Sequence, residues 1–137
     1  MPSVRAAALA LVFMLILVSG FQLALALGAP LGSFAMGGAF QGTYPPAMRI
    51  AAILQVVLYA GIGIIVLSCA EVAFPKLRGL AGRLIWPIVL LFVAATVLNF
   101  ISPSARERLL WTPVAIAILL LSLRVALRTR SQRTGPG

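Results

Sequence analysis

The stretch AAALALVFMLILVSGFQLALAL, at residues 6–27, decides the fold class. It carries no charged side chain, and about 20 apolar residues in a helix cross the hydrocarbon core of a bilayer. Arg5 before it and Ala24–Ala26 near its end also fit a cleaved signal peptide. The apolar part of a signal peptide has about 7–15 residues, so the greater length here favours a retained membrane span.

Three further apolar stretches follow, and each is long enough to span a membrane. The predicted spans are Ala6–Leu27, Ala47–Ala70, Leu84–Ile101 and Leu109–Leu127. We therefore predict an all-α fold, an integral membrane four-helix bundle in one domain over residues 1–127, and a disordered basic tail over residues 128–137. Pro46 and Pro87 are expected in opening turns, where a missing N–H is tolerated. Ser104 and Glu107 have the spacing of a capping box before the last span.

Composition supports lipid as the solvent of this chain. Hydrophobic residues make up 62% of it, charged residues 9%, and its mean hydropathy is +1.12. A soluble domain carries roughly a quarter charged residues. The net charge of +9 comes from side chains at the ends of the apolar stretches, which predicts contact with anionic lipid headgroups and no nucleic-acid partner.

Positive charge also predicts the orientation, because basic residues accumulate on the cytoplasmic side. With both termini inside, the cytoplasmic residues are Arg5, Lys76, Arg78, Arg83, Arg124, Arg128, Arg130 and Arg133, against Arg49, Arg106 and Arg108 outside. We predict an N-in, C-in topology with a glycine-rich outer loop between the first two spans.

The residue types needed for most catalysis are missing. The sequence has no histidine, two carboxylates (Glu71 and Glu107) and one cysteine, Cys69. This set cannot form a catalytic triad, a metal cluster or a disulfide, and the predicted topology separates the two acids. We expect a non-enzyme with no metal and no cofactor. Glu71, close to Lys76 and Arg78, is expected in a surface ion pair rather than in a proton relay.

Polar side chains within the apolar stretches are the main candidates for a site. Gln22, Gln55, Tyr59 and Asn99 all fall in the predicted outer half, and Gln55 and Tyr59 share a helix face. One interpretation is that they hydrogen-bond across helices and hold the bundle together. The other is an outer-half polar cavity formed by Gln22, Gln55, Tyr59 and Asn99, with Arg49 and Glu107 paired at its rim.

The predicted outer loop, residues 28–44, has five glycines within fifteen residues. Glycine permits sharp turns and close backbone approach. Phe34, Met36, Phe40 and Tyr44 make the loop too apolar for free solution. It is expected either to lie in the headgroup region as a connector or to cap a ligand cavity.

Two segments together resemble small four-span integral membrane proteins of bacteria. The resemblance consists of a Gly-x-Pro-x-Gly and Gly-Gly loop and a Ser-x-x-Glu-Arg-x-x-Trp-x-Pro start to the last span. The matching residues are Gly28, Pro30, Gly32, Gly37, Gly38, Ser104, Glu107, Arg108, Trp111 and Pro113. The resemblance implies a four-span bundle in a bacterial plasma membrane and no particular activity.

Two functions remain open. The first is an accessory subunit of a larger membrane complex, or a bundle that binds a lipid or another amphiphile. The alternative is a small transporter for a neutral or lipophilic solute. The architecture resembles that of the dimeric small multidrug-resistance transporters, but the first span lacks the acid on which those depend. Gly20, Ala24 and Gly28 form a stripe of small residues that permits close packing within the bundle or in a homodimer.

Overall fold

A computed structural model describes the backbone of residues 3–34, 38–40 and 42–134, and side chains up to Ser131. Over this part of the chain the fold is an all-α four-helix bundle, as predicted. The helices are α1 (Val4–Ala26), α2 (Pro46–Cys69), α3 (Arg78–Phe100) and α4 (Ala105–Thr134), with 3₁₀ turns η1 (Gly32–Phe34) and η3 (Pro75–Leu77). All four helices are long and apolar enough to cross a membrane. Met36 and Gly37 of the loop, the Arg133 side chain and residues 135–137 of the tail lie outside the described part.

The ends of α3 and α4 differ from the predicted spans, because both helices continue beyond their apolar stretches. α3 begins at Arg78 rather than Leu84, so Pro87 lies in the helix interior and not in an opening turn. α4 begins at Ala105 and runs without interruption past Pro113 to Thr134. The prediction of a disordered tail is therefore wrong for residues 128–134, which are helical. Hydropathy locates the part of a helix that lies in lipid, whereas arginine is itself a good helix former and extends the helix beyond it.

The ends of α1 follow from local hydrogen bonding. Ser3 caps its start, accepting a hydrogen bond of 3.1 Å from the Ala6 N–H. At the other end Gly28 adopts a φ of 102°, and the Ala29 N–H donates to the Ala24 carbonyl at 2.9 Å. This is a Schellman motif, which requires the left-handed conformation that glycine adopts without steric cost. It turns the chain sharply out of α1 into the loop.

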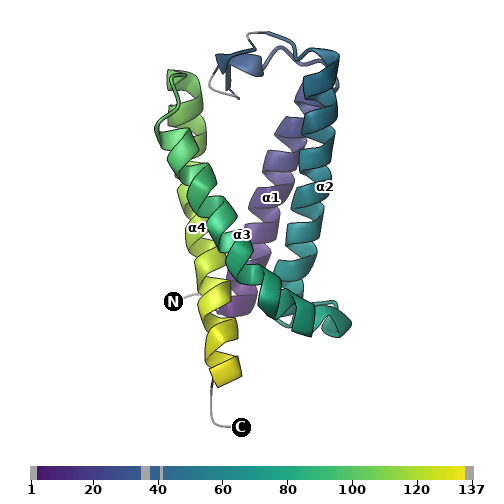
Figure 1. Cartoon of the computed structure of the whole chain (residues 1–137), viewed down its shortest axis with the longest axis vertical. Coiled ribbons are helices and arrows are strands. Elements are labelled where there is room, and N and C mark those ends of the chain that lie inside the picture. The colour runs from purple at the N-terminus through teal and green to yellow at the C-terminus, as the bar shows by residue number, and fades with distance from the viewer. Residues whose placement is uncertain (1–2, 35–37, 41, 135–137) are drawn as a thin grey trace.

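The bundle consists of two helical hairpins that diverge. α1 packs chiefly against α2, and α3 against α4. Both termini lie at one end, called here the termini end, and the α1–α2 loop and α3–α4 turn lie at the other, the loop end (Figure 1). α3 crosses towards α2 near the termini end and moves away from it towards the loop end (Figure 1).

The main core lies in the half of the bundle nearer the termini end. Each helix contributes a residue with no exposed surface: Ala8 on α1, Val66 on α2, Ile85 on α3 and Val125 on α4. Small residues such as Ala7, Ala70, Ala81 and Ala126 let the helices approach closely. A separate, smaller cluster formed by Leu25, Tyr44 and Ala52 lies at the loop end.

Large apolar side chains cover the outside of the bundle. Leu90 is 68% exposed, Leu58 48% and Phe13 60%, which is the arrangement expected of helices whose solvent is lipid. Gly20 is also exposed, and a methyl group added there would meet no atom within 4 Å. The predicted small-residue stripe is thus not used for packing within this chain at Gly20.

Candidate functional site

A cavity of about 550 Å³ occupies the loop-end half of the bundle, between the diverging hairpins. All four helices, the α1–α2 loop and the α3–α4 turn contribute to its wall. The cavity brings together five of the six residues proposed from sequence: Gln22, Gln55, Tyr59, Asn99 and Glu107. Its volume lies in the range of small-molecule sites.

Arg49, the sixth proposed residue, is not among the residues that line the cavity. Its Nε donates to the Tyr44 carbonyl at 2.9 Å, and its guanidinium lies beside Gly28, where an added Cβ would be 3.3 Å from Nη2. Arg49 therefore ties the end of the loop to the end of α1. Its pairing with Glu107 stays a prediction.

The amide side chains of the cavity hydrogen-bond within their own helices. Gln55 Nε2 donates to the Tyr59 hydroxyl at 2.9 Å, one turn away on α2, and Asn99 Nδ2 donates to the Ala95 carbonyl at 2.8 Å on α3. Among the described residues, the Gln22 amide has no hydrogen-bond partner, although its atoms are not sealed from solvent. These bonds do not link one helix to another. The hydrogen bonds expected for residues that hold a bundle together are therefore not the ones observed at these positions.

Glu107 belongs to a short hydrogen-bonded chain at the start of α4. The Glu107 N–H donates to Ser104 Oγ at 3.3 Å, so Ser104 is the N-cap, as the sequence indicated. In a capping box the Glu107 side chain would accept from the Ser104 N–H, but here the Ser102 hydroxyl lies between the two groups. Ser102 Oγ accepts from the Ser104 N–H at 3.2 Å and donates to Glu107 Oε2 at 2.6 Å. This arrangement fixes the carboxylate in the wall of the cavity.

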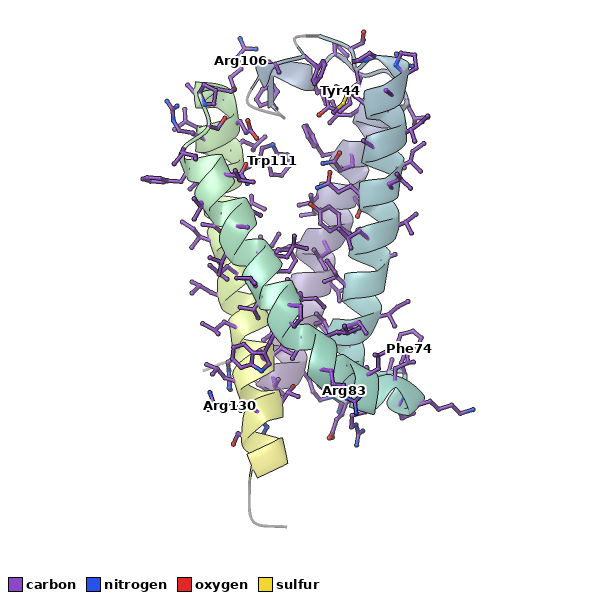
Figure 2. The ribbon with its side chains drawn as sticks, in the orientation of Figure 1. Tyr44, Phe74, Arg83, Arg106, Trp111 and Arg130 are labelled. Atoms are coloured by element: carbon purple, nitrogen blue, oxygen red, sulfur yellow. The ribbon has the colours of Figure 1, made fainter. Side chains whose placement is uncertain are left out.

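Aromatic rings form much of the remaining wall. Phe21 of α1 meets Trp111 of α4 edge to face, with ring centroids 4.7 Å apart. Trp111 points from α4 into the space between the hairpins, and Tyr44 lies beneath the loop (Figure 2). Tyr59 and Phe92 line the cavity from α2 and α3. Such large side chains, in place of the alanines of the main core, are compatible with the wider helix separation here.

The α1–α2 loop crosses the cavity and is bonded to the opposite hairpin. The Ser104 hydroxyl donates to the Ser33 carbonyl at 2.7 Å, and Trp111 Nε1 donates to the Phe34 carbonyl at 2.8 Å. Arg106 Nη1 donates to Ser33 Oγ at 3.3 Å and its guanidinium lies 5.8 Å from the centre of the Phe34 ring. Phe34 and Tyr44 themselves line the cavity. The loop thus covers the cavity from one hairpin to the other.

Two features of the loop explain why it has this sequence. Gly32 lies so close to the returning chain that a Cβ would be 1.7 Å from the Phe40 carbonyl oxygen, and its N–H donates to the Gly42 carbonyl at 2.8 Å. Only glycine fits this close approach. Tyr44 is 4% exposed; burial, and then the charge of Glu107, raise the pKa of its phenol above 10.0, so it stays protonated at neutral pH.

The other residues considered from sequence lie at the opposite end. Glu71 is 3.6 Å from Arg78 in an ion pair between exposed side chains, which confirms the expected surface pair. Cys69 is buried in the main core, as expected of a packing residue. Tyr59, Phe34 and Tyr44 were predicted at or above the cavity, whereas Ser102, Phe21, Phe92 and Trp111 were not. Aromatic spacing alone gave no signal, because the rings come from different helices.

No family model, no curated protein and no solved structure matches this chain. Four apolar helices make it a multi-pass membrane protein, and its role is inferred from the cavity.

Proposed function

We propose that this protein binds an amphiphilic molecule in the loop-end cavity, without catalysis, either alone or as an accessory subunit of a larger membrane complex. The observation that carries the proposal is the cavity itself, which combines apolar and aromatic walls with a few polar groups. Gln22, Gln55, Asn99 and Glu107 offer hydrogen bonds to a headgroup, while Val18, Leu98 and Ile118 offer a surface to an acyl or isoprenoid chain. This is the composition of small-molecule sites in general.

The proposed orientation places the loop end outside and the termini end in the cytoplasm of a bacterium. Lys76, Arg78, Arg83, Arg128 and Arg130 belong to η3, the start of α3 and the last turns of α4, which lie at the termini end (Figure 1), and basic residues accumulate on the cytoplasmic side of membranes. Anionic headgroups of the inner leaflet would then contact these residues. The cavity would open to the outer leaflet, so its ligand would be a lipid or lipophilic solute of that leaflet.

Binding is favoured over transport by the contrast between the two ends. The core of the half nearer the termini is filled by residues such as Leu11, Val66 and Ile85, which have no exposed surface, and the groove of about 650 Å³ beside this core, between α2 and α3, is lined by apolar residues. A transporter needs a second arrangement that opens this half, and the main core there is apolar, with the buried Ser122 and Thr129 hydroxyls bonded within α4. Uptake of a lipophilic solute by reconstituted protein would favour the transporter instead.

The test uses two adjacent alanines of α3. Ala95 lines the cavity, whereas Ala94 is exposed on the outside of the helix. The full chain would be purified in lipid nanodiscs, and bound amphiphile would be measured by native mass spectrometry. Ala95→Phe should fill the cavity and reduce bound amphiphile at least tenfold, and Ala94→Phe should leave it unchanged. Equal retention by both variants would contradict the proposal.

A second pair of variants addresses the polar groups. Gln55→Leu and Tyr59→Phe each remove one partner of a bond within α2, so the bundle should remain folded. Bound amphiphile should fall several-fold in both. If every measured activity survives both substitutions, the cavity is not the site.

A further inference from the structure

The charged side chain in the cavity wall is negative, whereas the net charge of the whole chain is positive. The chain has a net charge of +9 and two carboxylates, yet one of these, Glu107, lies in the wall. Among the described residues that line the cavity there is no lysine or arginine. A carboxylate in a cavity wall attracts a cation, and the attraction is stronger where less water surrounds the pair.

The two arginines beside Glu107 in sequence are held by other groups. Arg106 donates to Ser33 Oγ and lies over the Phe34 ring. Arg108 Nη1 donates to the Ser102 carbonyl at the end of α3. Both side chains are exposed, and neither lines the cavity.

Aromatic rings complete the enclosure. Phe21, Phe34, Tyr44, Tyr59, Phe92 and Trp111 all line the cavity. The face of an aromatic ring attracts a cation, and cages of aromatic rings recognise quaternary ammonium groups. The Arg106 guanidinium lies over the Phe34 ring, 5.8 Å from its centroid, so one of these rings already makes a cation–π contact.

From this combination we propose that the cavity selects amphiphiles with an amine or quaternary ammonium headgroup, with Glu107 as the counter-charge and the rings of Trp111 and Tyr59 near the cation. The proposal rests on the proposed function and adds the chemical class of the ligand. The headgroup chemistry is shared by zwitterionic lipids and by free lipophilic cations. The apolar tail would lie along Val18, Leu98 and Ile118.

The two tryptophans provide a direct measurement. Trp111 lines the cavity, whereas Trp86 is partly exposed on α3 in the half nearer the termini. Trp86→Phe leaves Trp111 as the reporter of the cavity, and Trp111→Phe leaves Trp86 as the reporter of the surrounding bilayer. The probes are three brominated twelve-carbon amphiphiles that quench tryptophan on contact, with trimethylammonium, hydroxyl or sulfate headgroups, added to nanodiscs of phosphatidylglycerol.

We expect the trimethylammonium probe to quench Trp111 at about a tenfold lower mole fraction than the alcohol, after normalising to Trp86. Glu107→Gln should abolish this difference, because it removes the charge but keeps an oxygen that accepts from Ser102. Quenching by the alcohol should persist in that variant. Addition of phosphatidylcholine to the nanodiscs separates the sources: competition with the probe identifies a lipid headgroup, and its absence identifies a free lipophilic cation.

The remaining outcomes contradict either the headgroup proposal or amphiphile binding itself. Equal quenching by ammonium and alcohol probes, or a preference for sulfate, would contradict the headgroup proposal while leaving amphiphile binding intact. If no probe quenches Trp111 beyond Trp86, and Ala95→Phe changes nothing, amphiphile binding itself is wrong. Circular dichroism of Glu107→Gln would establish that its bundle is still folded.

Discussion

The two halves of this bundle are built from the same four helices but with side chains of different size. Near the termini end, alanines and β-branched residues let the helices touch, and Ala8, Ala81 and Val125 have no exposed surface. Near the loop end, Phe21 and Trp111 meet between the hairpins, and a cavity of about 550 Å³ remains. Small residues thus let the helices meet in the core of one half, where the remaining space is an apolar groove of about 650 Å³ between α2 and α3, whereas rings and a covering loop border the cavity of the other half.

Polar groups in the two halves differ in the same way. Ser122 and Thr129, near the termini end, are buried and donate to backbone carbonyls of their own helix at 2.8 and 2.9 Å. They present little surface to anything else. Gln55 and Asn99, near the loop end, also hydrogen-bond within their own helices, but they are only partly buried and line the cavity. Their polar groups therefore stay accessible to a ligand.

The largest expected effect comes from creating a void in the closed half. Leu11 has no exposed surface, so Leu11→Ala should lower the free energy of unfolding by about 2–5 kcal/mol. Leu9 on the same helix is 53% exposed, and Leu9→Ala should cost clearly less. Reversible unfolding in mixed micelles measures both. Equal losses of unfolding free energy in the two variants would show that the half nearer the termini is not tightly packed around Leu11.

The next effect concerns the loop over the hollow half. Gly32→Ala places a methyl group 1.7 Å from the Phe40 carbonyl oxygen, so the loop must rearrange. We expect the loop to be destabilised by about 1–3 kcal/mol. Hydrogen exchange of residues 31–34 should accelerate while α1 and α4 stay protected. Gly61→Ala is the control, because an added methyl there meets no atom within 4 Å.

A smaller effect is expected from the bond between the loop and α4. Trp111→Phe keeps an aromatic ring beside Phe21 but removes the Nε1 donor to the Phe34 carbonyl, a loss of about 1 kcal/mol. Hydrogen exchange at the loop should rise several-fold. Trp86→Phe, which changes a partly exposed ring elsewhere, should not alter it. Unchanged loop exchange in Trp111→Phe would show that this bond does not hold the loop.

The smallest effect appears only at alkaline pH. The pKa of Tyr44 is raised in the folded state by burial and by Glu107, so the protonated phenol stabilises the folded loop below pH 10. This contribution should be lost progressively as the pH rises above 10. Tyr44→Phe should be less sensitive to pH over the same range. Parallel alkaline titrations of loop hydrogen exchange would show the difference, and identical profiles would contradict it.

The number of helices was predictable because each crosses lipid, and hydropathy reports that directly. Helix ends were less predictable. Arg78 and Arg128 lie in helices although their charges exclude them from an apolar stretch. Ser104 was recognised as an N-cap from its spacing to Glu107, since capping depends on neighbours in sequence.

The candidate site was only partly visible in the sequence. Polar residues such as Gln55 and Asn99 stood out because their neighbours are apolar. The bonds that place the loop over the cavity join residues 71 to 77 positions apart, and no local pattern encodes them. The same holds for the contact of Phe21 with Trp111, which depends on how two hairpins dock.

The length of α4 has a mechanical consequence. Its 30 residues rise about 45 Å, well beyond the roughly 30 Å of bilayer hydrocarbon. The helix that carries Glu107 and Trp111 at one end therefore continues, without a break, into the basic turns around Arg128 and Arg130 at the other. Because the helix is continuous, a change in its tilt at one end moves the other end as well. A ligand that tilts α4 at its first turns would therefore displace these arginines at the opposite membrane surface.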